Sequence, residues 1–226
     1  MKIGILITGH PPEPLSGNGR YDAYFRRLLG EETFTYASWA VVDGEMPDSV
    51  IDADGWLITG SRHGAYEDHD WIPPLEDFIR ACHAARRPMI GICFGHQIIA
   101  QAMGGRVEKF DGGWSVGRVE YDLEGQKTAI NAWHQDQVVE KPASATVIGA
   151  TDFCANAALL YDDIFWTLQP HPEYNHDFIR FLIEARGGAV PDDLKTNAIA
   201  AMNRPTDSDQ MADRIGEFFR RHDQKE

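Results

Sequence analysis

The chain contains little cysteine, little positive charge and no long hydrophobic segment. Its 226 residues include 3 cysteines, too few for a disulfide framework, so we expect free thiols in a reducing compartment. Lysine and arginine number 21 against 35 aspartate and glutamate residues. The net charge of −14 argues against nucleic acid or an anionic membrane surface as a partner. The apolar run within residues 1–9 is too short for a signal sequence or a membrane span, and we expect a cytoplasmic protein.

The composition and the order of strand and helix patterns predict a single soluble α/β domain. Hydrophobic residues make up 43% and charged residues 25% of the chain, which is ordinary for a globular domain. Short apolar runs predict buried strands and stretches with helical spacing predict helices, and the two alternate through the first half. The predicted strands are 1–9, 33–39, 55–59 and 89–92, and the predicted helices are 21–29, 71–85 with Asp70 as its cap, and 94–103.

The second half of the chain has a different pattern. Short β-rich runs at residues 116–121, 128–133, 146–148 and 158–161 follow one another without long helical patterns, and some of them should extend the sheet in antiparallel fashion. Helical spacing returns around Phe178 and again around Phe218. Residues 187–191 are the predicted linker. We expect residues 187–226 to form a helical extension packed on the same domain as residues 1–186, with packing on a partner protein as the alternative.

One of the three cysteines lies where a nucleophile is expected. Cys93 stands between Gly91 and Gly95, where a short apolar strand runs into a helix with almost no turn. Such a junction projects the sulfur above the sheet edge, and the free N–H groups and positive end of the new helix favour the thiolate. Cys82, in a helical pattern, and Cys154, among small residues near a turn, are expected to be buried core thiols.

A base for this thiol is predicted 78 residues beyond it. His171 follows the apolar run 164–168, which predicts a buried strand, so it would lie just past a strand end, where sites in open α/β sheets are built. Pro172 favours an extended conformation for His171, and residues two apart in an extended segment point to the same side. Glu173 can therefore reach the far ring nitrogen and orient the imidazole. The alternative is a structural turn with a solvated histidine.

We predict no cofactor and no metal ion from the sequence. His171 and Glu173 would supply half of a metal site, but no other histidine, cysteine or acidic cluster has a convincing ligand spacing. Residues 67–70, Glu-Asp-His-Asp, are expected to form a solvated loop and a helix cap.

These motifs resemble those of one enzyme family. Residues 91–97, Gly-Ile-Cys-Phe-Gly-His-Gln, combined with His171-Pro172-Glu173, resemble the class I glutamine amidotransferases, whose members use a Cys-His-Glu triad. The likeness runs from the first strand to about residue 186 and includes residues 58–61, Ile-Thr-Gly-Ser, and 133–136, Trp-His-Gln-Asp. It implies a three-layer, flavodoxin-like fold with a mostly parallel sheet, flanking helices and an antiparallel extension. Residues 58–72 are most similar to a stand-alone branch that includes γ-glutamyl peptidases.

Catalysis by Cys93 requires two hydrogen-bond donors for the oxyanion of the tetrahedral intermediate. The N–H of Phe94, directly after the nucleophile, is expected to be one donor. The resemblance implies Gly60 as the second donor, because it places the glycine loop beside the nucleophile. The resemblance also implies that a γ-glutamyl group is held by Gln97, His134, Gln135 and Asp136. Tyr66 and Trp114 are candidates for the leaving-group side.

Three hypotheses on function remain. The first is cysteine-dependent hydrolysis of a γ-glutamyl amide bond through a γ-glutamyl thioester, which releases glutamate and ammonia or an amine. The second is a glutaminase subunit that delivers ammonia to a separate synthetase. The third is a non-catalytic binding or regulatory protein on the same fold. The sequence of residues 58–72 favours the first, and the presence of all three triad residue types argues against the third.

Overall fold

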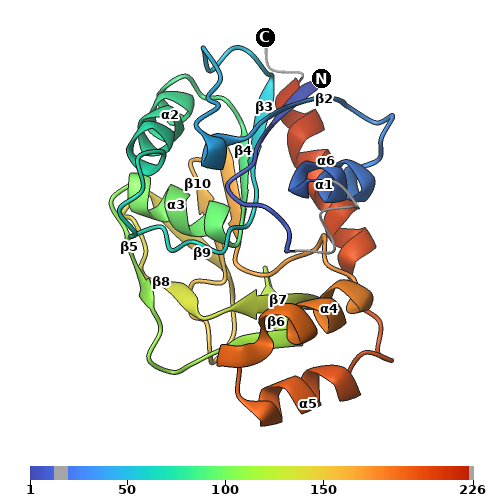
Figure 1. The fold of residues 1–226 in the computed structure, drawn as a ribbon. Coiled ribbons are helices and arrows are strands. Elements are labelled where there is room, and N and C mark those ends of the chain that lie inside the picture. The colour runs from blue at the N-terminus through green and yellow to red at the C-terminus, as the bar shows by residue number, and fades with distance from the viewer. Residues whose placement is uncertain (13–19, 224–226) are drawn as a thin grey trace.

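The computed structural model describes residues 1–12 and 20–223, which form a mixed sheet with helices on both faces (Figure 1). The order of the nine-stranded sheet is β2-β1-β3-β4-β11-β10-β9-β6-β7. The pairs from β2 to β11 are parallel, whereas β10, β9, β6 and β7 are each antiparallel to the preceding strand in this order. The predicted fold class, including the antiparallel extension, is confirmed.

The strands differ in how well the sequence predicts them. The parallel part comprises β1 (Lys2–Leu6), β2 (Thr35–Trp39), β3 (Gly55–Ile58), β4 (Met89–Ile92) and β11 (Phe165–Leu168). The antiparallel part comprises β6 (Ser115–Leu123), β7 (Gln126–His134), β9 (Ala145–Ala150) and β10 (Ala158–Tyr161). A second, two-stranded sheet pairs β5 (Arg106–Lys109) with β8 (Asp136–Glu140). The sequence pattern did not predict β5 and β8, because these short strands bury few side chains and have little apolar periodicity.

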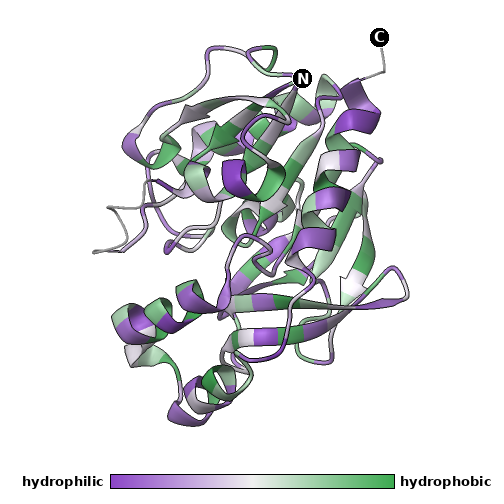
Figure 2. Ribbon diagram, turned by 90° about the vertical axis from the view of Figure 1, so that its right-hand side faces the viewer, coloured by the Kyte–Doolittle hydropathy of each residue, from purple (hydrophilic) through white to green (hydrophobic). Residues whose placement is uncertain are grey.

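Two hydrophobic clusters, one on each face of the parallel strands, hold the three layers together. Helices α1 (Tyr21–Leu29) and α6 (Ser208–Asp223) cover one face, and α2 (Ile72–Ala84) and α3 (Phe94–Ala102) cover the other (Figure 1). Within β3, Leu57 packs in the cluster beneath α1 and α6, whereas Trp56 and Ile58 pack in the cluster beneath α2 and α3. Figure 2 shows hydrophobic residues along the central strands and mixed hydropathy on the helices. Burial on both faces explains why these strands have continuous apolar sequences.

The C-terminal residues form three helices, α4 (His176–Arg186), α5 (Asp192–Ala200) and α6, with a short 3-10 helix η3 (Gly187–Ala189) between the first two. The predicted linker is thus partly helical, and Val190 within it is buried. Helix α6 contributes four buried side chains to the cluster that it shares with α1, namely Met211, Ile215, Phe218 and Phe219. The division of the chain at residue 186 stays a prediction.

One helix start differs from its prediction. Helix α2 begins at Ile72, its N-cap residue is Trp71, and no side chain makes a cap hydrogen bond, so the prediction that Asp70 caps this helix is wrong. The N–H of Ile72 instead donates to the carbonyl of His69, and prolines occupy the first turn, where a missing N–H costs little.

A short 3-10 helix, η2 (Val41–Asp43), follows β2. None of the described helices is long and apolar enough to cross a membrane.

We expect Phe219→Ala to destabilise the domain as a whole. Phe219 is fully buried, and it covers Gly55 so closely that a Cβ atom on that glycine would lie 2.9 Å from its ring. Truncation of a buried phenylalanine leaves a cavity and costs about 3–5 kcal/mol. Urea denaturation should therefore show one transition at a lower midpoint.

The matched control is Glu217→Ala, on the exposed side of the same helix, which should change the free energy of unfolding by less than about 0.5 kcal/mol. If Phe219→Ala were as stable as this control, residues 208–223 would not be part of the cooperative core.

Candidate active site

Cys93 occupies a strained position between β4 and α3. Its backbone has φ 52° and ψ −102°, a conformation that residues other than glycine rarely adopt. The junction is so tight that a Cβ atom on Gly91 would lie 2.6 Å from the carbonyl of Gly95, and one on Gly95 would lie 2.4 Å from the carbonyl oxygen of Ile58. The two glycines that flank Cys93 are therefore required by close packing. This strand–turn–helix geometry is that of a nucleophile elbow.

His171 and Glu173 follow β11, the strand next to β4, and are joined by a short hydrogen bond. Nδ1 of His171 lies 2.7 Å from Oε1 of Glu173, and the two side chains are only 3% and 1% exposed. The N–H of His171 donates to the carbonyl of Asn131 on β7, and the ring of Tyr174 stacks on the imidazole with centroids 4.0 Å apart. The backbone and the ring of His171 are thus both constrained by neighbouring residues.

The charges around His171 favour its protonated form. Burial opposes the imidazolium, but the charge of Glu173 and the charge and hydrogen bond of Cys93 outweigh it and raise the pKa of His171 to about 10. At neutral pH the imidazole therefore carries its proton. An imidazolium beside a cysteine is the arrangement that stabilises a thiolate nucleophile.

The loop after β3 lies against both side chains. A Cβ atom on Gly60 would be 2.9 Å from Cε1 of His171 and 3.8 Å from Cβ of Cys93. The preceding carbonyl, that of Thr59, accepts hydrogen bonds from the N–H of Gly95 at 3.2 Å and from the hydroxyl of Thr8 at 3.0 Å. Because the carbonyl and the next N–H of one peptide point in opposite directions, these two bonds set the direction of the Gly60 N–H.

The N–H groups of Gly60 and Phe94 are both available beside Cys93. Within the described residues, neither N–H group donates a backbone hydrogen bond outside the regular helices and strands. Phe94 is the first residue of α3, whose initial N–H groups have no partner inside the helix.

The residues predicted to bind substrate line one cavity of about 340 Å³, which Cys93 and His171 also line. The predicted contacts Gln97, His134, Gln135 and Asp136 and the predicted flanking residues Tyr66 and Trp114 are all on its wall. The amide of Gln97 already donates to the carbonyl of Asp136, 3.0 Å away, and to Oε1 of Gln169, 3.1 Å away. Burial lowers the pKa of His134 to about 4, so this imidazole is neutral.

Several polar residues around the site were not predicted from the sequence, among them Gln169 beside the sulfur of Cys93 and Arg186 on the cavity wall. Nε2 of Gln169 lies 3.6 Å from the sulfur of Cys93, and the pattern around His171 contained the signal, because Gln169 is two residues before the histidine. Arg186, at the end of α4, lines the cavity, and the sequence contains no local signal for it because its position depends on how α4 packs. The roles of all these residues stay predictions.

Comparison with known proteins finds relatives along most of the chain. The family model described as glutamine amidotransferase class-I matches residues 36–178. γ-Glutamyl peptidase 4 of Arabidopsis thaliana is 32% identical over 204 residues, which cover 82% of this chain and 81% of that protein. A glutamine-hydrolyzing GMP synthase subunit of Sulfolobus acidocaldarius is 27% identical over 61% of this chain and 76% of its own length.

A solved structure with a similar fold is the glutamine amido transferase from Methylobacillus flagellatus. It has a TM-score of 0.75 at 22% identity and covers 98% of this chain and 94% of its own. The family model spans more than half of the chain, and the plant relative is similar over most of both lengths. The chain therefore belongs to the class I glutamine amidotransferase family.

Proposed function

We propose that this protein hydrolyses a γ-glutamyl amide bond with Cys93 as nucleophile, His171 as acid and base, and Glu173 as the group that orients His171. The observation that carries the proposal is the strained backbone of Cys93 at the start of α3, beside a buried imidazole that is hydrogen-bonded to a buried carboxylate. Backbone strain and the burial of a charge pair both cost free energy, and both costs fit a catalytic role.

The first half of the reaction forms a thioester. The thiolate of Cys93 attacks the γ-carbonyl carbon, and the resulting oxyanion accepts hydrogen bonds from the N–H groups of Gly60 and Phe94. The C–N bond then breaks as the imidazolium of His171 gives its proton to the departing ammonia or amine. The product on the protein is a γ-glutamyl thioester.

The second half hydrolyses that thioester. His171, now neutral, accepts a proton from a water molecule as its oxygen attacks the same carbonyl carbon. The C–S bond breaks, the sulfur leaves as a thiolate, and glutamate is released. Both the imidazolium and the thiolate are thereby restored.

Charged groups on the cavity wall suit a γ-glutamyl group. We assign the α-carboxylate to Arg186 and the α-ammonium to Asp136, with Gln97 and the backbone of residues 134–136 as further contacts. Gln97 also holds the carbonyl of Asp136, so it positions this wall. The hydroxyl of Tyr66 donates a hydrogen bond to the carboxylate of Asp136 at 3.1 Å, which supports a position for this tyrosine beside the substrate.

The relatives support hydrolysis first and ammonia delivery second. The relative named γ-glutamyl peptidase is similar over 82% of this chain, which favours an enzyme that acts alone on γ-glutamyl compounds. The relative named as a GMP synthase subunit is similar over 61% of the chain, which supports a glutaminase that serves a separate synthetase as the alternative. A non-catalytic binding protein would give no reason to keep the nucleophile, base and orienting acid together.

We expect the purified chain to release glutamate from γ-glutamyl peptides and amines, and Cys93→Ser to abolish that release, because serine at this position is a far weaker nucleophile. Glutamate release is measured against glutamine, γ-glutamyl peptides and γ-glutamyl amines. Fast turnover without a partner supports the hydrolase, whereas activity that appears only with a synthetase supports the ammonia-delivering alternative.

The control for the thiol is Cys82→Ala, on the buried face of α2, where burial raises the pKa of the thiol and keeps it inert. Its turnover per folded molecule should equal that of the parent. Equal activity in Cys93→Ser and the parent would remove Cys93 from the mechanism.

We expect Glu173→Gln to move the alkaline limb of the kcat/KM profile to lower pH. Glu173 helps to raise the pKa of His171 to about 10, so in the parent the imidazolium is lost only as pH rises through that value. An adjacent opposite charge is worth about 1–3 pKa units, and the limb should shift down by that amount. A pH–rate profile of both proteins measures the shift.

Glu184→Gln removes an exposed carboxylate from α4 and serves as the matched control, with an unchanged profile. An unchanged limb in Glu173→Gln would mean that His171 does not carry the titrating proton.

Thr8→Val should lower kcat with little effect on KM. The substitution removes the hydroxyl that holds the Thr59 carbonyl, and with it part of the restraint on the Gly60 N–H. One oxyanion donor contributes about 10²–10³ in kcat, so a misdirected donor should cost at least about tenfold. Steady-state kinetics measure the change, and Thr8→Ser, which keeps the hydroxyl, should retain most of the activity. Equal losses in the valine and serine variants would point to packing rather than to the hydrogen bond.

A further inference from the structure

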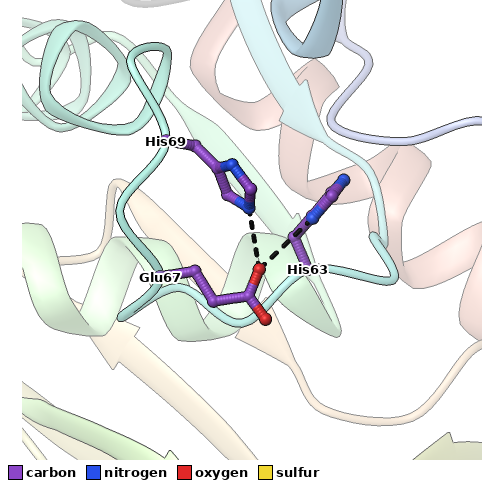
Figure 3. A group of neighbouring side chains, drawn as sticks. All are labelled: His63, Glu67 and His69. Atoms are coloured by element: carbon purple, nitrogen blue, oxygen red, sulfur yellow. Dashed lines mark hydrogen bonds and ion pairs between the residues drawn. The ribbon is translucent and has the colours of Figure 1, made fainter.

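Two histidines and a glutamate converge on the turn between β3 and α2. The ligand atoms of His63, Glu67 and His69 all lie within 4.8 Å of one another. Oε2 of Glu67 is 3.3 Å from Nδ1 of His63 and 2.7 Å from Nε2 of His69, and Figure 3 shows both imidazoles directed at this carboxylate. We propose that this group binds one divalent transition-metal ion, with Zn²⁺ as the ion that the ligand set favours.

The donor types select the ion. Two imidazole nitrogens and one carboxylate oxygen form a set used for zinc sites with an open position, whereas magnesium and calcium prefer oxygen ligands alone. A fourth position is left for water. The spacing His-x₃-Glu-x-His in residues 63–69 places all three donors on one short turn. Distant parts of the chain therefore do not have to come together to assemble the site.

The distances are close to those that an ion requires. Zinc–ligand bonds of about 2.0–2.2 Å in a tetrahedral site separate the ligand atoms by about 3.3–3.5 Å. The contact between Glu67 and His63 already has this length, and that between Glu67 and His69 is shorter. The side chains of His63, Glu67 and His69 are 19%, 42% and 32% exposed, so they are free to adjust and an ion can enter from solvent.

The bound ion would stiffen one wall of the cavity. His63 and Glu67 line the cavity together with Cys93. The ring of His69 stacks on Trp71 with centroids 5.7 Å apart, and Trp71 contacts Phe94 at 5.5 Å between ring centroids. Coordination at residues 63–69 would therefore link the turn, through Trp71, to the start of α3. Binding of the ion goes beyond the proposed reaction and does not depend on it.

The test measures metal binding in a chain without the reactive thiol. The full-length Cys93→Ser protein, freed of metal by a chelator and dialysed, is titrated with ZnCl₂ by calorimetry, and we expect one ion per chain. His69→Gln and Glu67→Gln should each weaken this site by at least about 100-fold, because each removes one of three ligands. Co²⁺ added to the same protein should give the visible absorption bands of a four-coordinate nitrogen and oxygen site.

His10→Gln is the matched control, because His10 is also a partly exposed histidine bonded to a carboxylate, at 2.9 Å from Asp43. Zinc binding should be unchanged in this variant. Circular dichroism checks the fold of each variant. The Co²⁺ spectrum is recorded on the protein that keeps all three ligands, so this test does not depend on whether the ligand variants fold. The proposal is overturned by an absence of binding at micromolar Zn²⁺, by equal affinity in His69→Gln and the control, or by a six-coordinate Co²⁺ spectrum.

Discussion

The backbone conformation of Cys93 is the constraint on which the rest of the site depends. A residue with a positive φ at the end of β4 allows α3 to start at once, and this is possible only because Gly91 and Gly95 leave no Cβ atoms in the way. The N–H of Cys93 donates to the carbonyl of Leu168 on β11. The strand that leads to His171 is therefore hydrogen-bonded to Cys93 itself, which fixes the position of the imidazole relative to the sulfur.

Burial strengthens the interaction between His171 and Glu173 and also makes the loss of either partner costly. The pair of His171 and Glu173 is almost fully removed from water, and in such surroundings a paired charge is stabilised by its partner, whereas an unpaired charge is costly. Tyr174 stacks on the imidazole and Asn131 holds its backbone, so little rotational freedom is left to the ring. The fold thus holds a costly buried charge pair in one orientation, as the proposed role of His171 as acid and base requires.

The sequence predicts those parts of the molecule that depend on short-range patterns. The elbow at Cys93 and the segment of His171 and Glu173 were recognisable because glycine, proline and apolar strands mark them locally. Strands β5 and β8 lack such a pattern. Asp70 looks like a cap in the sequence, but α2 begins two residues later, at Ile72, without a side-chain cap. Arg186 and the group formed by His63 with residues 67–69 were missed, because the position of an arginine on a helix and the folding of a turn depend on tertiary packing.

The turn after β3 connects features that the sequence presents separately. At its start, Gly60 lies against His171, and its end packs through Trp71 on Phe94, the residue that follows the nucleophile. The same turn contributes to the cavity wall, where Tyr66 bonds to Asp136 from the second sheet. Residues 60–71 therefore include one expected oxyanion donor, Gly60, and contact both the other donor, Phe94, and the proposed substrate contact Asp136. A change that stiffens or loosens this turn would therefore move the N–H of Gly60 and the cavity wall together without altering Cys93, His171 or Glu173, so the turn can tune the proposed site from outside the three residues.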